Sequence, residues 1–289
     1  WIDIREVVMS GRTFTGICID TDCIIGVTGH IEEGVLLITD AYSMDRTTDR
    51  GHDLHRFIKQ NSLDGERFGI VAQMDTQKCM VGVAKEVDFE EFLRWNLEDI
   101  TGWDTKIYTY DYCLRIDDMG QKYLYVAALK TEDLDDVNIG ILLSHIRVKI
   151  IDYWPSPLIY LYTHRNGFIL GEVQGDSVHL YAWWKGVCIM ESQVDANGPA
   201  IVASINELES HLQTYGIEEV QGVKIYGIEE LAEETQYDIH AIEEEYGLME
   251  TADVQIVDRA KENFQSGDIH WDMALGLVIR GLDYVLPSR

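Results

Sequence analysis

The sequence has few cysteines, few prolines and little positive charge. Its 289 residues include five cysteines and four prolines. The cysteines are odd in number and none forms a Cys-x-x-Cys pair, which argues against a disulfide framework and against a structural zinc site. Scattered cysteines of this kind fit a reducing cytoplasm. We therefore expect the fold to depend on a hydrophobic core, for which the apolar fraction of 46% is ordinary.

Positive charge is scarce because 23 Lys and Arg stand against 51 Asp and Glu, a formal charge of −28. Such a field repels phosphate backbones and anionic lipid headgroups, so we expect no nucleic acid and no direct membrane contact. A long apolar run is also missing. The run near the C-terminus, Met273–Ile279, is far shorter than the ~20 residues that span a bilayer. The charge instead favours basic segments of a partner protein, through which any membrane association would occur.

Two stretches of the chain repeat the same order of expected elements. Each begins with three β-rich runs separated by turns at glycine, and continues with an amphipathic helix and a further strand. The first copy comprises residues 14–19, 24–28 and 35–42, a helix around 54–58 and a strand at 68–74. The second comprises residues 168–173, 177–184 and 187–194, a helix from Pro199 and a strand at 223–226. The copies are offset by about 154 positions, which indicates a duplicated unit.

Each copy is expected to end with one more strand and one more helix. The expected ranges are 148–153 and 155–163 in the first copy, and 254–257 and 269–285 in the second. Three meandering strands followed by helices and parallel crossover strands is the order of a ribonuclease-H-like lobe. We therefore predict an α/β protein of the actin-like architecture. Its first lobe would span residues 1–165 and its second lobe 166–289.

The first copy contains an extra block at about 82–146, between its fourth and fifth strands. The pattern there predicts an αββα subdomain, with elements at 88–100, 106–116, 122–129 and 132–144. A block of this size would be a subdomain of the first lobe.

Several stretches resemble the type IV pilus assembly protein PilM family, cytoplasmic relatives of the cell-division protein FtsA. They are the opening strand GICID at 16–20, the helix EEFLRWNLEDI at 90–100, the strands YVAALK at 125–130 and VKIID at 148–152, and the closing helix ALGLVIRGL at 274–282. The last is the most specific, and its small residues would let a helix lie close on a sheet. The resemblance covers nearly the whole chain.

The resemblance implies a non-catalytic cytoplasmic scaffold, peripheral at the inner face of the cell membrane. It would bind the N-terminal cytoplasmic peptide of a bitopic PilN-like protein, together with other proteins of an inner-membrane platform. The aromatic residues of the extra block are the expected peptide contacts: Phe92, Trp95, Trp103 and Tyr110. The family also has an extra subdomain in its second lobe, but here Val194 leads to Pro199 directly. That subdomain is therefore missing or reduced, as in GspL-like relatives, and pilus assembly, DNA uptake and type II secretion all stay open.

The nucleotide-binding elements of the family are altered in this chain. In the first hairpin Asp20 is kept, but Thr21, Asp22 and Cys23 replace the glycine and serines that would cradle phosphate. The second hairpin at 171–177 lacks Asp-x-Gly, and the adenosine loop at 226–229 has lost two of its glycines. We therefore expect no ATPase activity and no cofactor, with residues 20–22 as a vestigial phosphate loop. The alternative is an ATP-binding actin-like switch or polymerising ATPase, with ATP and Mg²⁺ in this site.

Three other features have two interpretations each. His52, Asp53 and His55 have the spacing of a metal site, but we expect solvated residues of a first helical turn. Alternation along a strand places one of Trp183 and Trp184 in the core and the other outward, at a possible interface. The acidic stretch at 207–272 would form solvated helix faces or a docking surface for a basic tail.

Overall fold

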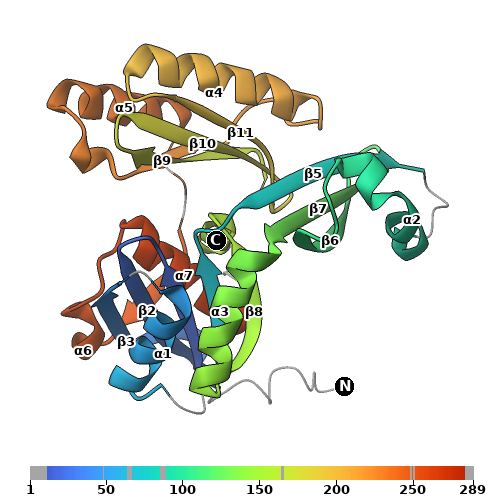
Figure 1. Ribbon diagram of the computed structural model, residues 1–289. Helices are drawn as coiled ribbons and strands as arrows, with labels where there is room; N and C mark the ends of the chain where they lie inside the picture. Colours follow the sequence, from blue (N-terminus) through green and yellow to red (C-terminus); the bar gives the residue numbers. More distant parts are fainter. Residues whose placement is uncertain are drawn as a thin grey trace. The chain divides into compact units, whose positions relative to one another are not determined.

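The computed structural model describes residues 12–47, 49–63, 67–84, 89–163, 166–247, 249 and 251–283, with backbone alone at 89, 90 and 94–96. The chain forms two compact units, each assembled from separate segments (Figure 1). The first comprises Trp1–Asp75, Glu132–Thr163 and Thr251–Arg289. The second comprises Thr76–Thr131 and His164–Glu250.

The first unit is built on a six-stranded sheet in the order β13-β3-β2-β1-β4-β8. Its strands are β1 (Phe14–Ile19), β2 (Cys23–Glu32), β3 (Val35–Asp45), β4 (Arg67–Ala72), β8 (Arg147–Tyr153) and β13 (Val254–Ile256). The meander β1 to β3 is antiparallel, whereas β4, β8 and β13 join it by parallel pairing. Every residue of β1 is buried, as expected for a central strand covered on both faces.

Helix α7 (Ile269–Gly281) covers one face of this sheet at very short range. A Cβ added at Gly16 would overlap the main-chain oxygen of Ala274, and one added at Gly276 would overlap Pro157 in the 3₁₀ helix η1 (Ser156–Leu161). The expected close packing of the closing helix is thus confirmed. Gly16 on β1 and Gly276 on α7 are required, because a side chain at either position would push the helix away.

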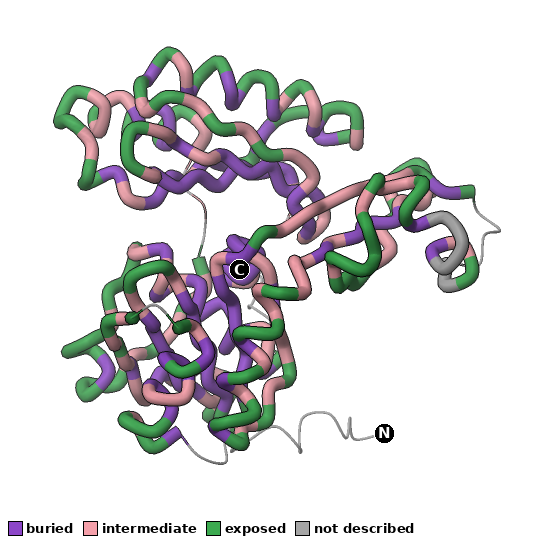
Figure 2. Tube along the Cα trace, viewed as in Figure 1, coloured by how far each residue is buried: buried purple, intermediate pink, exposed green. Residues whose placement is uncertain are grey.

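The opposite face of the sheet carries α1 (Arg50–Gln60), and α3 (Thr131–Ser144) packs on α1. Gly26 of β2 leaves room for the ring of Phe57, which projects from α1. Gly51 and Gly140 allow the two helices to touch along their main chains. A short helix, α6 (Asp258–Lys261), follows β13. Figure 2 shows the buried residues concentrated along the strands and on the inner sides of these helices.

The second unit contains two sheets. The larger has the order β11-β10-β9-β12, with α4 and α5 packed on it, and the smaller has the order β5-β7-β6. The larger sheet and its helices are β9 (Phe168–Gln174), β10 (Ser177–Trp184), β11 (Val187–Asp195), α4 (Gly198–Gln213), β12 (Val223–Tyr226), η2 (Ile228–Glu230) and α5 (Glu233–Tyr246). The smaller sheet and its helix are β5 (Thr76–Val83), α2 (Phe89–Thr101), β6 (Tyr108–Ile116) and β7 (Lys122–Lys130).

The small sheet is joined to the larger one by aromatic and charged contacts. The ring of Tyr123 on β7 lies edge-on to Trp184 and Tyr215, at centroid distances of 5.3 and 5.4 Å. Arg115 on β6 donates to the main-chain oxygen of Lys185, at 2.7 Å. Lys185 in return donates to the oxygen of Ile116 at 2.7 Å. These contacts explain why the two sheets form one compact unit.

Three expectations about these elements were wrong. The strand at 254–257 and the helix at 269–285 were assigned to the second lobe, but β13 pairs with β3 and α7 packs on β1, β2 and β4. The helix at 132–144 was assigned to the extra subdomain, but α3 packs on α1. The strand β5 was not predicted. The structure therefore divides the chain differently from a single boundary near residue 165.

Other expectations about elements are confirmed. Both three-stranded meanders, the helices and strands that follow them, α2, β6 and β7 occur as predicted. The connection from β11 to α4 consists of residues 196–197. Across the described residues, no helix is both long and apolar enough to span a membrane.

Candidate functional site

The turn between β1 and β2 holds the expected vestigial phosphate loop. The carboxylate of Asp20 lies 3.1 Å from Nε2 of His270, the second residue of α7. The other ring nitrogen, Nδ1, lies 3.2 Å from the carboxylate of Asp268. Asp268 is the N-cap of α7 and accepts main-chain hydrogen bonds from His270 and Trp271. The side chain of Asp20 is therefore engaged by a residue of this chain about 250 positions away.

The two carboxylates fix the charge of the imidazole between them. Burial alone would lower the pKa of His270, but hydrogen bonds and attraction from Asp20 and Asp268 raise it to about 10. Burial would raise the pKa of Asp20, yet the hydrogen bonds from His270 and the Thr21 amide leave it lowered. At neutral pH the group is thus an imidazolium held by two carboxylates. Both Thr21 and Asp22 are exposed on the turn.

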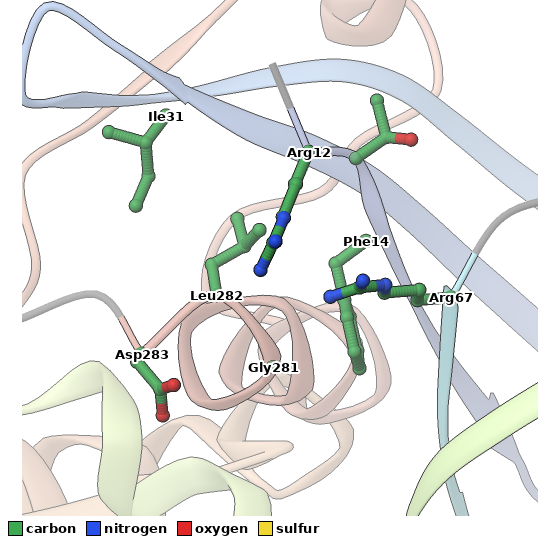
Figure 3. Close-up of a pocket in the computed structure, with 8 residues that line it drawn as sticks. Arg12, Phe14, Ile31, Arg67, Gly281, Leu282 and Asp283 are labelled. Carbon is green, nitrogen blue, oxygen red and sulfur yellow. The ribbon is translucent and has the colours of Figure 1, made fainter. Parts of the chain in front are cut away.

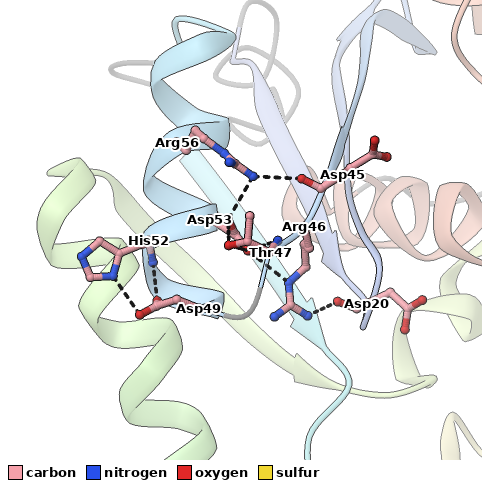
Figure 4. A network of polar contacts seen from close by, with 8 residues as sticks. All are labelled: Asp20, Asp45, Arg46, Thr47, Asp49, His52, Asp53 and Arg56. Carbon is pink, nitrogen blue, oxygen red and sulfur yellow. Dashed lines mark hydrogen bonds and ion pairs between the residues drawn. The ribbon is translucent and has the colours of Figure 1, made fainter.

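Arg46 ties this turn to the start of α1 (Figure 4). Its guanidinium donates to the main-chain oxygen of Asp20 and pairs with Asp53, which is 2% exposed. Asp53 also accepts from the amide of Thr47 at 2.7 Å and pairs with Arg56 at 3.0 Å. A buried carboxylate with this many donors organises the β3–α1 connection.

The spacing of His52, Asp53 and His55 does not produce a shared site. His52 is exposed and pairs with the N-cap Asp49 at 3.0 Å, and His55 lies 3.2 Å from the hydroxyl of Ser144. The expectation of solvated residues holds for His52 but was wrong for Asp53, whose oxygens are occupied by Arg and Thr donors.

Three of the four aromatic residues expected to contact a peptide have described side chains, and these differ in exposure. Phe92 and Trp103 are partly buried against a small core formed by α2 and the small sheet. Tyr110 is 39% exposed on β6. Trp95 lies on α2, and its side chain is outside the described part of the chain. Phe92 and Trp103 therefore stabilise the small sheet, and Tyr110 keeps a surface available to a partner.

A pocket that the sequence analysis missed lies between β5 and β11, and we call it the β5–β11 pocket. Its volume is about 310 Å³, at the lower end of the roughly 300–1,000 Å³ typical of ligand pockets. The pocket is lined by residues 76–80, Tyr125 and residues 188–191. β5 and β11 are the end strands of their sheets, as those sheets are described. The signal in the sequence was weak because Gln77 and Lys78 interrupt the apolar pattern of β5.

Lys78 and Glu191 form an ion pair inside the β5–β11 pocket. The side chain of Lys78 is 12% exposed and lies over the ring of Tyr181, 5.7 Å from its centroid. The side chain of Glu191 is 44% exposed. Burial raises the pKa of the nearby Cys188 thiol, so this sulfur is protonated at neutral pH. The pocket therefore presents a carboxylate at its open side and a buried ammonium beneath it.

A second pocket lies at the other end of β1, beside Phe14 (Figure 3). Arg12 and Arg67 line it together with the end of α7 at Gly281 and Asp283. Its volume is about 50 Å³, room for only a few water molecules. This space is too small for a peptide or a nucleotide.

The two adjacent tryptophans at the end of β10 are both part of the core of the second unit. Trp183 and Trp184 are each 0% exposed. Trp183 stacks on Phe168 of the neighbouring strand, at a centroid distance of 6.1 Å. Trp184 is covered by Tyr123 and Tyr215, so the expectation that one of the two tryptophans faces outward was wrong. Its interface is thus an internal one, between the two sheets of the second unit.

Comparison with known proteins finds likeness in structure and not in sequence. No family model matches the chain, and no curated protein matches it. The chain is similar to a solved structure of the PilM-PilN type IV pilus biogenesis complex, with a TM-score of 0.60 and 14% identity, over 93% of this chain and 98% of that one. It is also similar to the cytoplasmic domain of EpsL, an inner-membrane component of the type II secretion system of Vibrio cholerae. That match has a TM-score of 0.52 and 13% identity, over 91% of this chain and 94% of the other.

The fold class follows from these matches and from the sheet order. The chain has an actin-like fold, as the repeated meanders predicted. The resemblance to the PilM and GspL-like group that the sequence indicated is confirmed at the level of fold.

Proposed function

We propose that this protein is a non-catalytic scaffold in the inner-membrane platform of a type IV pilus or type II secretion machine, located at the cytoplasmic face of the membrane. Its partner would be a bitopic, PilN-like membrane protein, whose short N-terminal cytoplasmic segment binds in the β5–β11 pocket. The likeness to a PilM-PilN complex and to an inner-membrane secretion component supports this class of partner.

The observation that carries the proposal is the construction of the β5–β11 pocket. Each long side of the pocket is the end strand of a sheet, and an end strand can accept an extended segment through its main chain. The carboxylate of Glu191 is paired with Lys78 but is still 44% exposed, so a basic side chain of such a segment could share it. Cytoplasmic segments next to a membrane span are rich in Lys and Arg. A basic segment therefore complements both this carboxylate and the net charge of −28.

The turn at Asp20 supports the non-catalytic part of the proposal. An actin-like ATPase needs main-chain amides and a carboxylate available to phosphate and Mg²⁺. Here the Asp20 carboxylate is bound to His270 and its main-chain oxygen is bound to Arg46. The exposed carboxylate of Asp22 adds repulsion for a phosphate arriving at this turn.

The direct test is calorimetric titration with a synthetic peptide. The peptide covers the cytoplasmic N-terminal segment of a PilN-like bitopic membrane protein from the same organism. We expect one peptide per chain at micromolar concentrations, and about tenfold weaker binding to Glu191→Lys because the charge at the pocket is reversed. Glu207→Lys is the matched control, since Glu207 is exposed on α4 away from the pocket lining. Absence of binding at tens of micromolar, or equal weakening in both variants, contradicts the proposal.

A further inference from the structure

Three side chains of metal-ligand type meet at the β1–β2 turn. They are Asp20, Cys23 at the start of β2, and His270 in the first turn of α7. A carboxylate oxygen, the thiol sulfur and a ring nitrogen from these residues all lie within 4.8 Å of one another. No other group of three such ligands comes together within the described ranges of the chain. Each of the three residues is partly buried, so the cluster is enclosed and still accessible to an ion.

The donor set is characteristic of zinc. Thiolate, imidazole and carboxylate are its three protein ligand types, and sites with three protein ligands leave the fourth position for water or another ligand. Ligands around one zinc ion lie about 3.5 Å apart, given metal–ligand bonds of ~2.0–2.3 Å. The separation of 3.1 Å between the Asp20 oxygen and Nε2 of His270 is already in this range. A small movement of the Cys23 side chain would complete the set.

The surroundings match those of a zinc-bound histidine. A histidine that binds zinc through one ring nitrogen usually donates from the other to a carboxylate. Nδ1 of His270 lies 3.2 Å from Asp268, whose position is fixed as the N-cap of α7. This contact directs Nε2 toward Asp20, the side on which Cys23 lies.

The local field favours a dication. Four carboxylates act on Cys23, those of Asp20, Asp22, Asp45 and Asp268. The same field attracts a divalent cation, which stabilises the thiolate it binds. Arg46 adds one positive charge, but it contacts the main-chain oxygen of Asp20 and the carboxylate of Asp53.

We propose that Asp20, Cys23 and His270 form a Zn²⁺ site, with Asp268 orienting the histidine. On binding, the ion replaces the Nε2 proton of the imidazolium and the thiol proton of Cys23, and both protons go to solvent. The site is independent of the β5–β11 pocket and of the partner proposed above. The sequence predicted no metal, and residue spacing could not show this group, because Asp20 and His270 are 250 positions apart.

The test uses protein without an affinity tag, treated with chelator and then titrated with Co²⁺ and with Zn²⁺ in the presence of excess Mg²⁺. We expect one Co²⁺ per chain and a near-ultraviolet thiolate-to-cobalt charge-transfer band, which Zn²⁺ abolishes by displacement. The band should be absent in Cys23→Ser and strongly reduced in His270→Asn. Cys113→Ser is the matched control and should keep the band, since Cys113 lies on β6 in the second unit.

Each outcome decides the proposal. Absence of the band in the wild-type protein overturns it, and this measurement does not depend on any variant folding. A band that persists in Cys23→Ser overturns it as well, because another thiolate would then be the ligand. Binding of Co²⁺ without the band identifies the acidic surface as the ligand and rejects the site. Far-ultraviolet circular dichroism of the two ligand variants shows whether the loss is local.

Discussion

At the scale of single residues, buried and half-buried carboxylates organise the turns of the first unit. Asp20 and Asp268 hold His270, while Asp53 holds Arg46, Thr47 and Arg56 (Figure 4). A strongly acidic composition therefore does not place every carboxylate in solvent. Sequence spacing could show which residues were acidic, but not which of them would meet a cation from another element.

Asp53→Ala should destabilise the first unit more than any change at a solvated acid. Removing this carboxylate leaves Arg46, whose side chain is 8% exposed, without its buried partner, so we expect a loss of about 3–5 kcal/mol. Asp49→Ala is the comparison, since it removes an exposed N-cap and should cost ~1 kcal/mol. Urea unfolding followed by circular dichroism measures both. Equal losses in the two variants would show that the Asp53 network has no special weight.

Gly16→Ala should also destabilise, because the added methyl group would overlap the main chain of α7 at Ala274. We expect a loss of about 1–3 kcal/mol from this overpacking. Gly82→Ala is the matched control at an exposed position of β5, where the nearest atom to an added Cβ is 3.8 Å away. Thermal unfolding of the two variants against the wild-type protein tests the prediction. A Gly16 variant as stable as the Gly82 variant would mean that α7 does not approach β1 so closely.

At the scale of elements, local patterns predicted what depends on local order. The alternation of apolar residues and the glycine turns predicted both meanders, and the small residues of 274–282 predicted a helix packed tightly on a sheet. The return of the chain to the first sheet was not predictable. β13 has only three residues, and it pairs with β3, which lies more than two hundred positions earlier in the chain. No local sequence pattern specifies this pairing.

The candidate site was predicted in the same uneven way. The alteration of the phosphate loop at residues 20–22 could be seen in the sequence, because the glycine and serines of the family's loop are replaced there. The partner of Asp20 could not, because His270 comes from an element assigned to the other lobe. The β5–β11 pocket was missed for a related reason, since it depends on two sheets packing side by side.

Trp184→Ala should destabilise both sheets of the second unit, the larger one and the small one. Trp184 is fully buried and contacts both Tyr123 of the small sheet and Tyr215 after α4, so we expect a loss of about 3–5 kcal/mol in the second unit. Amide hydrogen exchange measured by mass spectrometry should accelerate in β6 and β7 as well as in β9 and β10. Faster exchange confined to β9 and β10 would contradict the shared unit. Strands β1 and β2 of the first unit serve as the internal control.

At the scale of the whole molecule, the chain combines an actin-like fold with a strongly acidic composition. The fold is shared with proteins of pilus and secretion machinery at 13–14% identity. At this identity the topology is retained while individual sites diverge. The net charge of −28 disfavours the binding of anionic ligands and favours the binding of basic segments.

Mg-ATP should leave the thermal midpoint of the protein unchanged. A ligand that binds the folded state raises the midpoint, because it stabilises that state by an amount that grows with the logarithm of its concentration over Kd, about 2.7 kcal/mol at a hundredfold excess. Because the Asp20 turn is occupied by His270 and Arg46, we expect no such shift. A midpoint raised by Mg-ATP and restored by Asp20→Ala would favour the ATP-binding switch instead.

The most direct measurement is the calorimetric titration of this protein with the cytoplasmic segment of the proposed membrane partner, carried out with and without Mg-ATP and at two salt concentrations. We expect binding of one segment per chain, the same affinity with and without nucleotide, and weaker binding at the higher salt. Binding that requires Mg-ATP, or no binding in either condition, would contradict this expectation.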